Sequence, residues 1–341
     1  MDTAGRRCAL CADANASLTG TKAAAFGFPP AQQEDSSMKK TGAVRIGISG
    51  WTYAPWRGQF YPEDLPQKQE LSYAARHFRS IEINGTFYGL QKPDSFGRWR
   101  DETPDDFVFA VKGPRFITHV RRLKEIEAPL ANFFASGLLR LGPKLGPILW
   151  QFPPNMAFDP DRFETFLSLL PHDHDAAIAL SKRHDERLKQ AWLKSDGHQP
   201  IRHALEIRND SFRSAAFIDM LRRHKVALVC ADTVKWPLLM DITADFIYCR
   251  LHGSEQLYVS GYEDEALDIW AERIRAWTGG GEPDNATRVL DPLPGRARGR
   301  DVYLYFDNTD KKLRAPIDAG HLAERLADLM PRSHRNARMS C

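Results

Sequence analysis

Eight short apolar runs recur along this 341-residue chain, each rich in β-branched and aromatic residues, with loops or amphipathic segments between them. Runs of this kind, separated by helical patterns, are typical of parallel strands joined by crossover helices. Eight such strands predict an α/β fold, a single (β/α)8 barrel of the TIM type. The runs are VRIGIS (44–49), SIEINGTF (80–87), FVFAVK (107–112), GPILWQF (146–152), HALEIRN (203–209), ALVCAD (227–232), FIYCRLH (246–252) and VYLYFDN (302–308).

A doubly wound open sheet is the alternative fold, but the strand count and the lack of a GxGxxG after the first run weaken it. Apolar residues at helical spacing predict helices within 123–141 and 267–277. Two surface insertions interrupt the repeat. We expect a charged helix at 181–194 within the first, which spans 171–200, and a flexible loop in the Gly- and Arg-rich second, 279–300. Between the sixth and seventh runs the chain is too short and Pro-broken for a full helix.

Both ends of the chain are predicted to lie outside the barrel. Residues 1–43 are rich in small and polar residues without periodicity, which predicts a disordered extension before a barrel domain at 44–330, and 331–341 form a flexible tail. The CxxC of Cys8 and Cys11 has neither two further ligands nor a strand–helix context, so we interpret it as inert. Met38, just before the first strand, is an alternative start of the protein.

Charge and cysteine usage limit the partners of this chain. The 47 Lys and Arg residues against 44 Asp and Glu give a net charge of +3, which does not favour a nucleic acid as partner. Five scattered cysteines do not form a secreted disulfide pattern and suit a reducing compartment. No apolar run is long enough to span a membrane, and no secretory signal begins the chain. We therefore expect a cytoplasmic protein without a membrane partner, and no pattern indicates its oligomeric state.

The strand ends carry the polar residues that predict a site. In such a barrel the carboxyl ends of the strands surround one cavity. Strand alternation places Glu82 with Asn84, Glu206 with Arg208, and Arg250 with His252 on shared faces, and burying such pairs among the helices would be costly. The predicted substrate-binding residues are Trp51, Glu82, Asn84, Tyr88, Lys112, Arg115, Gln151, Arg208, Asn209, Arg250, Asp307 and Asn308.

Glu206 and Asp232 are predicted to be the catalytic acid/base pair, with His252 as a proton shuttle or orienting group. Arg208 would hold the Glu206 carboxylate ionised if the two touch. Lys112, Arg208 and Arg250 would act as electrostatic clamps for a phosphate or carboxylate of the substrate. Among the aromatic residues near these ends, Trp51 and Tyr88 are favoured as walls of the site.

Two other interpretations of these residues stay open. The charges could form a buried ion-pair network with a structural role only. The carboxylates and His252 could also bind a divalent metal, although no HExxH motif fixes the ligands and the adjacent Lys112, Arg208 and Arg250 would repel a cation. No cofactor is therefore predicted, with a divalent metal as the alternative.

Eight ordered motifs between Val44 and Ala327, among them GISGWTYAPWRGQFYP, FAVKGPRFITH, HALEIRNDSF and CRLHG, resemble those of the YecE-like family, called domain of unknown function 72. The resemblance implies a TIM-type barrel and no established reaction. The last motif reads FDNTDK rather than a shorter FDND- or FNND-like run. This departure affects Thr309 and Asp310 and leaves Asp307 and Asn308 in place.

The leading functional hypothesis is an enzyme, with hydrolysis as the favoured reaction, that acts by acid–base chemistry. Its substrate would be a small anionic or phosphorylated molecule, sugar-like or nucleotide-like, bound at the carboxyl ends of the strands. A non-catalytic ligand-binding or scaffold protein is one alternative. A metal-dependent phosphoesterase or nuclease is the other.

Overall fold

The computed structural model shows a closed barrel in which eight parallel strands pair in chain order, and β8 closes the barrel on β1. The structure describes residues 41–253, 255, 257, 260–295, 298–308 and 313–330. This confirms the (β/α)8 prediction and excludes the open sheet. The strands are β1 Val44–Ser49, β2 Ser80–Ile83, β3 Val108–Lys112, β4 Leu145–Gln151, β5 His203–Glu206, β6 Ala227–Asp232, β7 Phe246–Leu251 and β8 Asp301–Phe306.

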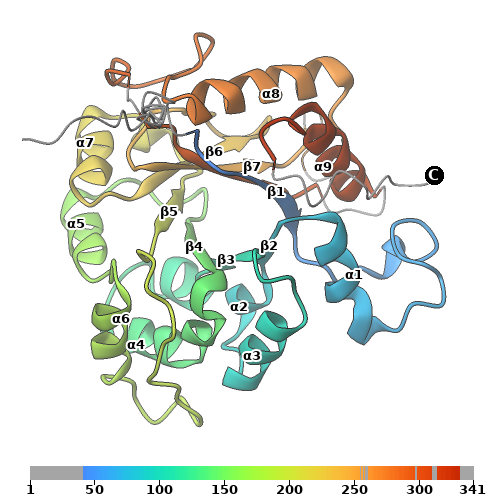
Figure 1. Ribbon diagram of the computed structural model, residues 1–341. Coiled ribbons are helices and arrows are strands. Elements are labelled where there is room, and N and C mark those ends of the chain that lie inside the picture. The colour runs from blue at the N-terminus through green and yellow to red at the C-terminus, as the bar shows by residue number, and fades with distance from the viewer. Residues whose placement is uncertain are drawn as a thin grey trace, which may run out of the picture. The chain divides into compact units, whose positions relative to one another are not determined.

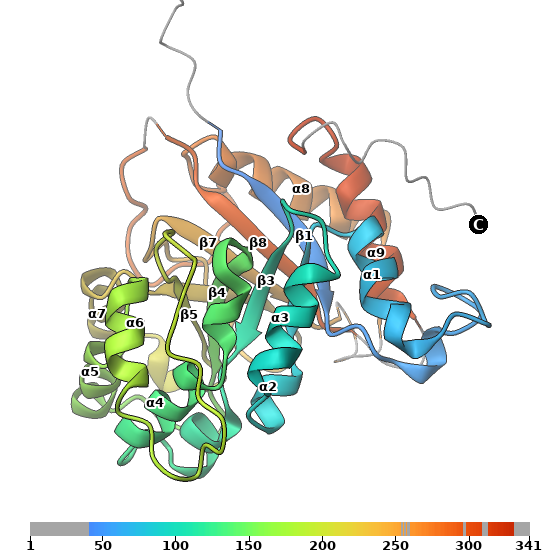
Figure 2. The ribbon, with the colours of Figure 1, turned by 60° about the horizontal axis from the view of Figure 1, so that its bottom comes forward.

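Helices surround this barrel (Figure 1). Figure 2 shows β1, β3 and β8 running toward the same end, where α2 lies. The helices are α1 Glu70–His77, α2 Gly85–Tyr88, α3 Pro93–Asp101, α4 Glu127–Ala135, α5 Pro160–Ser168, α6 His174–Ser181, α7 Ala215–Arg223, α8 Asp264–Thr278 and α9 Arg314–Arg325, with shorter turns η3 Phe116–Val120 and η4 Leu138–Lys144. Side-chain caps begin three of them, since Asp159, Asp173 and Ser214 accept hydrogen bonds from first-turn N–H groups of α5, α6 and α7.

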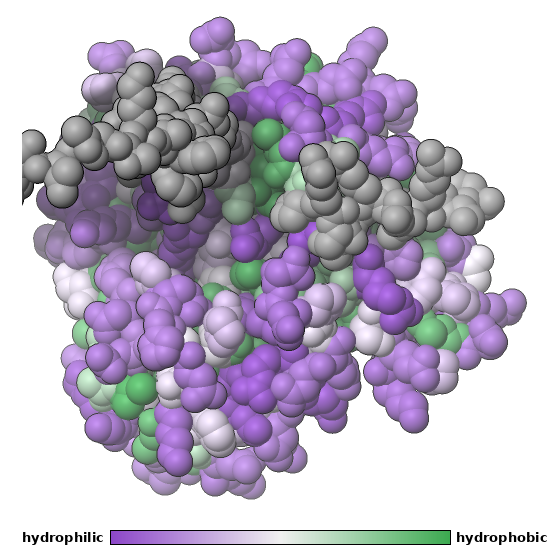
Figure 3. Space-filling view, in the orientation of Figure 1, coloured by the Kyte–Doolittle hydropathy of each residue, from purple (hydrophilic) through white to green (hydrophobic). Residues whose placement is uncertain are grey.

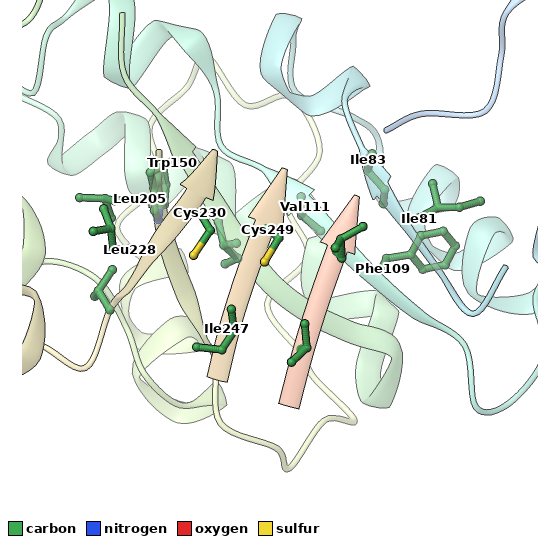
Figure 4. Packing of buried hydrophobic residues seen from close by; sticks show 14 of the residues in the cluster. Ile81, Ile83, Phe109, Val111, Trp150, Leu205, Leu228, Cys230, Ile247 and Cys249 are labelled. Atoms are coloured by element: carbon green, nitrogen blue, oxygen red, sulfur yellow. The ribbon is translucent and has the colours of Figure 1, made fainter. Parts of the chain in front are cut away.

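Strand alternation divides the buried side chains into two layers. Along β6, Ala227, Val229 and Ala231 belong to a small cluster within the barrel, whereas Leu228 and Cys230 belong to the large cluster between strands and helices. Cys230 and Cys249 are register partners on β6 and β7, and Figure 4 shows them among the residues of the outer cluster. The phase of each strand therefore decides which of its polar residues can reach the lumen.

Within the lumen, tyrosines and small residues lie beneath the charged strand ends. Tyr248 and Tyr305 pack with ring centroids 5.3 Å apart, and the Tyr305 hydroxyl lies 2.6 Å from Ser80 Oγ. On β1 the corresponding position is Gly47, where a Cβ atom would lie 1.9 Å from the carbonyl oxygen of Ser80. Only glycine allows β1 and β2 to approach this closely. The charged layer above thus rests on a closely packed floor.

Some local predictions were wrong. The segment 181–194 forms turns and coil rather than a charged helix, and the helix of this insertion is α6, which precedes it. The Asp185 side chain hydrogen-bonds Asn132 Nδ2 and the backbone N–H of Arg187, so local side-chain bonds compete with helix formation. Two strands are also shorter than the predicted runs 80–87 and 203–209, since β2 ends at Ile83 and β5 ends at Glu206.

Other expectations agree with the structure. The predicted helix within 267–277 is part of α8, and the one within 123–141 is divided into α4 and η4 at Gly137, whose φ is +116°. No helix forms in residues 233–245, between β6 and β7. Residues 1–40 and 331–341, which hold most of the predicted extension and the tail, lie outside the described residues, as do Cys8 and Cys11.

The molecular surface in the view of Figure 3 is mostly hydrophilic, and apolar residues show only as small separate patches. Within the described residues, no helix combines the length and the apolar character needed to cross a membrane.

Candidate active site

Arg250, near the end of β7, is the centre of the charged layer. Its guanidinium is fully buried and contacts three carboxylates. Nε and Nη2 donate to Glu82 at 3.1 and 2.9 Å, Nη1 donates to Glu206 at 2.5 Å, and Nη2 lies 2.9 Å from Asp307. Burial would lower the pKa of Arg250, but Asp307, Glu82 and Glu206 outweigh this and raise it well above its ordinary value. Arg250 is therefore a permanent cation joining β2, β5 and the end of β8.

Glu82 on β2 is held on all sides and has no exposed surface. Its Oε1 accepts a hydrogen bond from Ser49 Oγ at 2.7 Å, and its Oε2 accepts one from the Tyr248 hydroxyl at 2.6 Å, in addition to the Arg250 bonds. Burial, and next the charge of Glu82, raise the pKa of Tyr248 well above its ordinary value, so the phenol stays a donor. We assign Glu82 and Arg250 to supporting the site, rather than to contacting substrate as the sequence suggested.

Glu206 on β5 is held by two arginines. Arg208 Nε and Nη2 lie 2.7 and 2.6 Å from its Oε1, so the two residues touch, which is the condition for Arg208 to hold Glu206 ionised. Burial would raise the pKa of Glu206, but Arg208 and Arg250 outweigh it and keep the pKa well below its usual value. Arg208 also stacks on Trp236, with its guanidinium carbon 4.1 Å from the ring centroid, and its side chain is 11% exposed.

His252 connects two of these carboxylates. Its Nδ1 lies 3.0 Å from Asp307 Oδ2 and its Nε2 lies 3.6 Å from Glu206 Oε2, while the ring meets Trp236 edge to face. Asp307 is 13% exposed, whereas Glu82 and Glu206 are fully buried. Burial would raise the pKa of Asp307, but Arg250, and next the His252 hydrogen bond, lower it below its ordinary value. Asp307 is thus the carboxylate of the network that a ligand could touch.

Lys112, the last residue of β3, also points into the lumen, and its Nζ lies 4.4 Å from the centroid of the Phe87 ring. His119 also contacts Phe87, edge to face, with ring centroids 5.2 Å apart. Its Nδ1 is 2.9 Å from Thr118 Oγ1, and its Nε2 is 3.4 Å from Gln151 Nε2. Burial, followed by repulsion from Arg208, lowers the pKa of His119 to about 4, so this imidazole is neutral at neutral pH.

Asp232 does not join this cluster, which corrects the predicted acid/base pair with Glu206. Its Oδ2 accepts a hydrogen bond from the indole Nε1 of Trp270 on α8 at 2.9 Å. The neighbouring Ala231 occupies the lumen position of β6 instead. The acid/base pair would have required Asp232 and Glu206 to share a face, and the phase of β6 places Asp232 toward the helices.

Both predicted asparagines after β5 and β8 have structural roles. Asn308 Nδ2 donates to Asp318 Oδ2 on α9 at 2.9 Å and to the Ser260 carbonyl, so it faces the helix layer. Asn209 begins a short 3₁₀ turn by accepting from the N–H of Ser211, and its Nδ2 donates to the Pro154 carbonyl. These bonds hold loops in place and direct the amide groups of both side chains toward neighbouring parts of the protein.

The remaining predicted residues lie around the rim. Tyr88 is 74% exposed, and Arg115 is exposed at the start of η3. Trp51 packs edge to face on Trp99, 5.4 Å away, so it serves the core as well as the rim. The Asn84 Oδ1 atom is buried and has no hydrogen-bond partner among the described residues.

Three residues around the network were not predicted as site residues: Tyr248, Trp236 and His119. Tyr248 lies two residues before Arg250 on β7, so strand alternation in the sequence was a usable signal. The contacts of Trp236 with Arg208 and His252 depend on loop geometry that alternation does not describe. No group of three or more His, Cys, Asp or Glu side chains in the described residues is arranged to hold a metal ion.

The ionised carboxylates of this site predict sensitivity to acid. Because the pKa values of Glu206 and Asp307 are lower in the folded state than in the unfolded chain, they stabilise the fold above about pH 4. That stability is lost as the pH falls further through the lowered folded-state values. The pKa of the neutral His119, about 4, is also below its unfolded value, so a further loss of stability begins below about pH 6.5. Urea unfolding at pH 7, 5, 4 and 3 should therefore show a moderate fall of the unfolding free energy from pH 7 to pH 5 and a steeper fall below pH 4. Equal stability at pH 3 and pH 7 would contradict this.

The fold and part of the sequence are shared with known proteins. The family model described as "Protein of unknown function DUF72" matches residues 45–338. The UPF0759 protein YecE of Escherichia coli K12 is 27% identical over 241 residues, which cover 69% of this chain and 82% of YecE. The UPF0759 protein YunF of Bacillus subtilis is 28% identical over 116 residues, or 33% of this chain and 40% of YunF.

Solved structures give the same result for the fold alone. A DUF72 family protein from Thermotoga maritima superposes with a TM-score of 0.61 at 24% identity, covering 84% of this chain and 99% of that one. A second, from Enterococcus faecalis, superposes with a TM-score of 0.55 at 15% identity, covering 84% and 98%. With the family model matching nearly the whole barrel, this chain belongs to the DUF72 family of proteins of unknown function.

Proposed function

We propose that the carboxyl ends of the strands form the active site of an enzyme that acts by acid–base chemistry on a small anionic molecule. The main observation in support is the contact between the partly exposed Asp307 and the buried His252. Both belong to a network in which Arg250 contacts three carboxylates. Buried ion networks add little stability compared with apolar packing, and such clusters are concentrated at functional sites.

The arrangement gives each member of the network a role. Asp307 would contact the substrate and exchange a proton with His252, whose Nδ1 faces Asp307 and whose Nε2 faces Glu206. Glu206 itself, held ionised by Arg208 and Arg250, would position and stabilise the imidazole rather than donate a proton. This replaces the pair of Glu206 and Asp232 by the pair of Asp307 and His252.

Positive charge near the rim supports an anionic substrate. The charges of Arg208, Lys112 and Arg115 each lower the pKa of His119, so all three act on the same ring. Arg208 keeps 11% of its side chain exposed, and Arg115 is exposed. Guanidinium groups suit the planar oxygens of carboxylates and phosphates. A phosphorylated sugar-like or nucleotide-like molecule fits this description, and hydrolysis is one reaction that such a site could perform.

The alternatives differ in what they require. A metal-dependent phosphoesterase or nuclease has no support from the described residues, because the network carboxylates are each engaged by Arg250. A non-catalytic binding protein would use the same cations without any chemical change of its ligand. A cytoplasmic location is proposed on the cysteines, since Cys230 and Cys249 are free and buried.

A thermal-shift screen with product analysis tests the proposal. Wild type and Arg208→Ala are screened against phosphorylated sugars, nucleotides, carboxylates and divalent metals, with Arg275→Ala, a surface arginine paired with Asp328, as control. An anion at about 100 times its Kd should stabilise wild type and the control by about 2.7 kcal/mol, and Arg208→Ala much less. Mass spectrometry then follows conversion of that anion.

Each result has a distinct meaning. Stabilisation and conversion by wild type, both weakened in Arg208→Ala, support an enzyme at this site. Stabilisation without conversion favours the binding protein. A response to divalent metals alone, or equal responses of all three proteins to anions, would overturn the proposal.

A further inference from the structure

Lys112 differs from Arg208 and Arg250, the cations that hold the carboxylate network, because no carboxylate of the described residues pairs with it. Its side chain is 8% exposed, yet no hydrogen bond or ion pair joins its Nζ to any of the described residues. Its Nζ lies over the face of the Phe87 ring, 4.4 Å from the ring centroid. A mostly buried ammonium without acceptors among its protein neighbours is costly, because it loses much of its hydration without gaining hydrogen bonds. The amine at the end of β3 therefore has its nitrogen free to react.

Lys144 provides a comparison within the same protein. It is similarly buried, at 6% exposure, but its Nζ donates to the carbonyl oxygens of Arg100 and Thr103 at 2.6 and 2.7 Å. Those two short bonds fix the amine as a donor. Burial lowers the pKa of both lysines, so the difference between them lies in the hydrogen bonds.

Charged groups from four strands act on Lys112. Burial is the largest influence and lowers its pKa, and the Arg250 charge lowers it further, while Asp307, Glu82 and Glu206 oppose them. The result is a pKa of about 8. His119, which also contacts the Phe87 ring, is neutral at neutral pH and adds no positive charge there. Lysines made reactive in this way, by burial beside another cation, are nucleophiles toward carbonyl groups.

We propose that Lys112 is the nucleophile of this site and that it forms an imine with a small anionic aldehyde or ketone. The proposal rests on the proposed function and deepens it by naming the substrate class. It is based on the position of Nζ at the carboxyl end of the barrel, its lack of acceptors, and the nearby cations Arg208 and Arg115 that would hold the anionic end of the substrate.

The reaction is balanced without a further reagent. The Nζ lone pair of the neutral amine forms a bond to the carbonyl carbon, while the carbonyl π electrons move to oxygen. One proton moves from nitrogen to that oxygen, which gives the carbinolamine. A second proton leaves nitrogen and one reaches the hydroxyl, so that water departs and a carbon–nitrogen double bond forms. Asp307 and His252, which lie in the same layer, are placed to carry these protons.

Reductive trapping tests the inference. The full-length protein is treated at pH 7 with glyoxylate, a small anionic aldehyde, and sodium cyanoborohydride, which transfers hydride to the imine carbon. Peptide mapping by mass spectrometry locates the stable amine. At pH 7 the neutral fraction of an amine of pKa about 8 is roughly 200 times that of an ordinary lysine of pKa about 10.4. We expect Lys112 to be modified at least ten-fold faster than Lys144, with a half-maximal rate near pH 8.

The matched variant is Lys112→Arg, which keeps the positive charge and cannot form an imine. It should remain folded, as its melting temperature will show, and lose the adduct. If this variant fails to fold, the inference is tested by the ratio of Lys112 to Lys144 modification in the wild-type protein. Equal modification of the two lysines, or a Lys112 profile centred above pH 10, would overturn the inference.

Acetaldehyde, which carries no charge, separates this inference from the proposed function. Faster labelling by glyoxylate than by acetaldehyde supports both. Equal labelling of Lys112 by the two aldehydes supports the reactive amine and removes the anionic preference. No labelling of Lys112, combined with conversion of another anion in the screen, overturns the imine and leaves the proposed enzyme in place.

Discussion

Arg250→Met is expected to leave most of the protein unfolded or insoluble at 25 °C. Methionine fills a similar volume but removes the cation that contacts Glu82, Glu206 and Asp307. Breaking a buried ion pair from one side costs about 3–5 kcal/mol, because the remaining charge stays buried without compensation. Here two fully buried carboxylates and one partly exposed carboxylate lose the same partner. Domain stabilities are about 5–15 kcal/mol, so a loss of this size removes a large part of the total.

The control for this variant is Arg275→Met. Arg275 is an arginine on the surface that pairs with a single carboxylate. Its Nη1 and Nη2 lie 2.6 and 2.8 Å from the carboxylate oxygens of Asp328. An exposed pair contributes about 0–1 kcal/mol, so this variant should melt near wild type. A second variant tests the cause, since Glu82→Gln combined with Arg250→Met removes one stranded charge and should recover part of the stability. Soluble Arg250→Met with a melting temperature within a few degrees of wild type would contradict the role of Arg250.

The barrel could be predicted because its evidence is repeated eight times. Each run combines a strand-length apolar segment with a polar end, and errors in single boundaries, such as the end of β2, do not alter the strand order. The charged segment 181–194 does not form the predicted helix, because its side chains bond the nearby backbone instead, as Asp185 does by accepting from the N–H of Arg187. Competition between such side-chain bonds and helix formation leaves little trace in the sequence pattern.

The site residues could be predicted only on strands where the sequence shows which alternate side chains face the lumen. On β5 and β7 the polar residues themselves fix the phase, so Glu206, Arg250 and His252 were placed together correctly. On β6, ALVCAD is apolar on both faces, as strands covered on both sides usually are, and the phase that would place Asp232 was not evident. Whether an arginine binds substrate or only its neighbours depends on distances between strands. The saturation of Arg250 by three carboxylates therefore required the structure.

Asp307→Asn is expected to abolish most turnover of the anion that the screen identifies, with a loss of about 100- to 10,000-fold in kcat, the usual range for removing an acid–base group. Asparagine has nearly the same shape and keeps one acceptor oxygen for Arg250, so the fold should survive with a modest loss of stability. The amide cannot carry the proton that Asp307 exchanges with His252 across 3.0 Å. Initial rates followed by mass spectrometry, beside melting temperatures, measure both effects.

Asp232→Asn is the matched control, because it makes the same chemical change at the end of a neighbouring strand. Asp232 faces Trp270 and Tyr262 in the helix layer, so this variant weakens these hydrogen bonds and should turn over within a few-fold of wild type. If Asp232→Asn were as inactive as Asp307→Asn while folded, the original pairing of Asp232 with Glu206 would regain support. If Asp307→Asn kept the wild-type rate, the partly exposed carboxylate would have no part in proton transfer. Two Asp→Asn substitutions, one facing the lumen and one facing the helices, thus separate the chemistry of the site from packing between strands and helices.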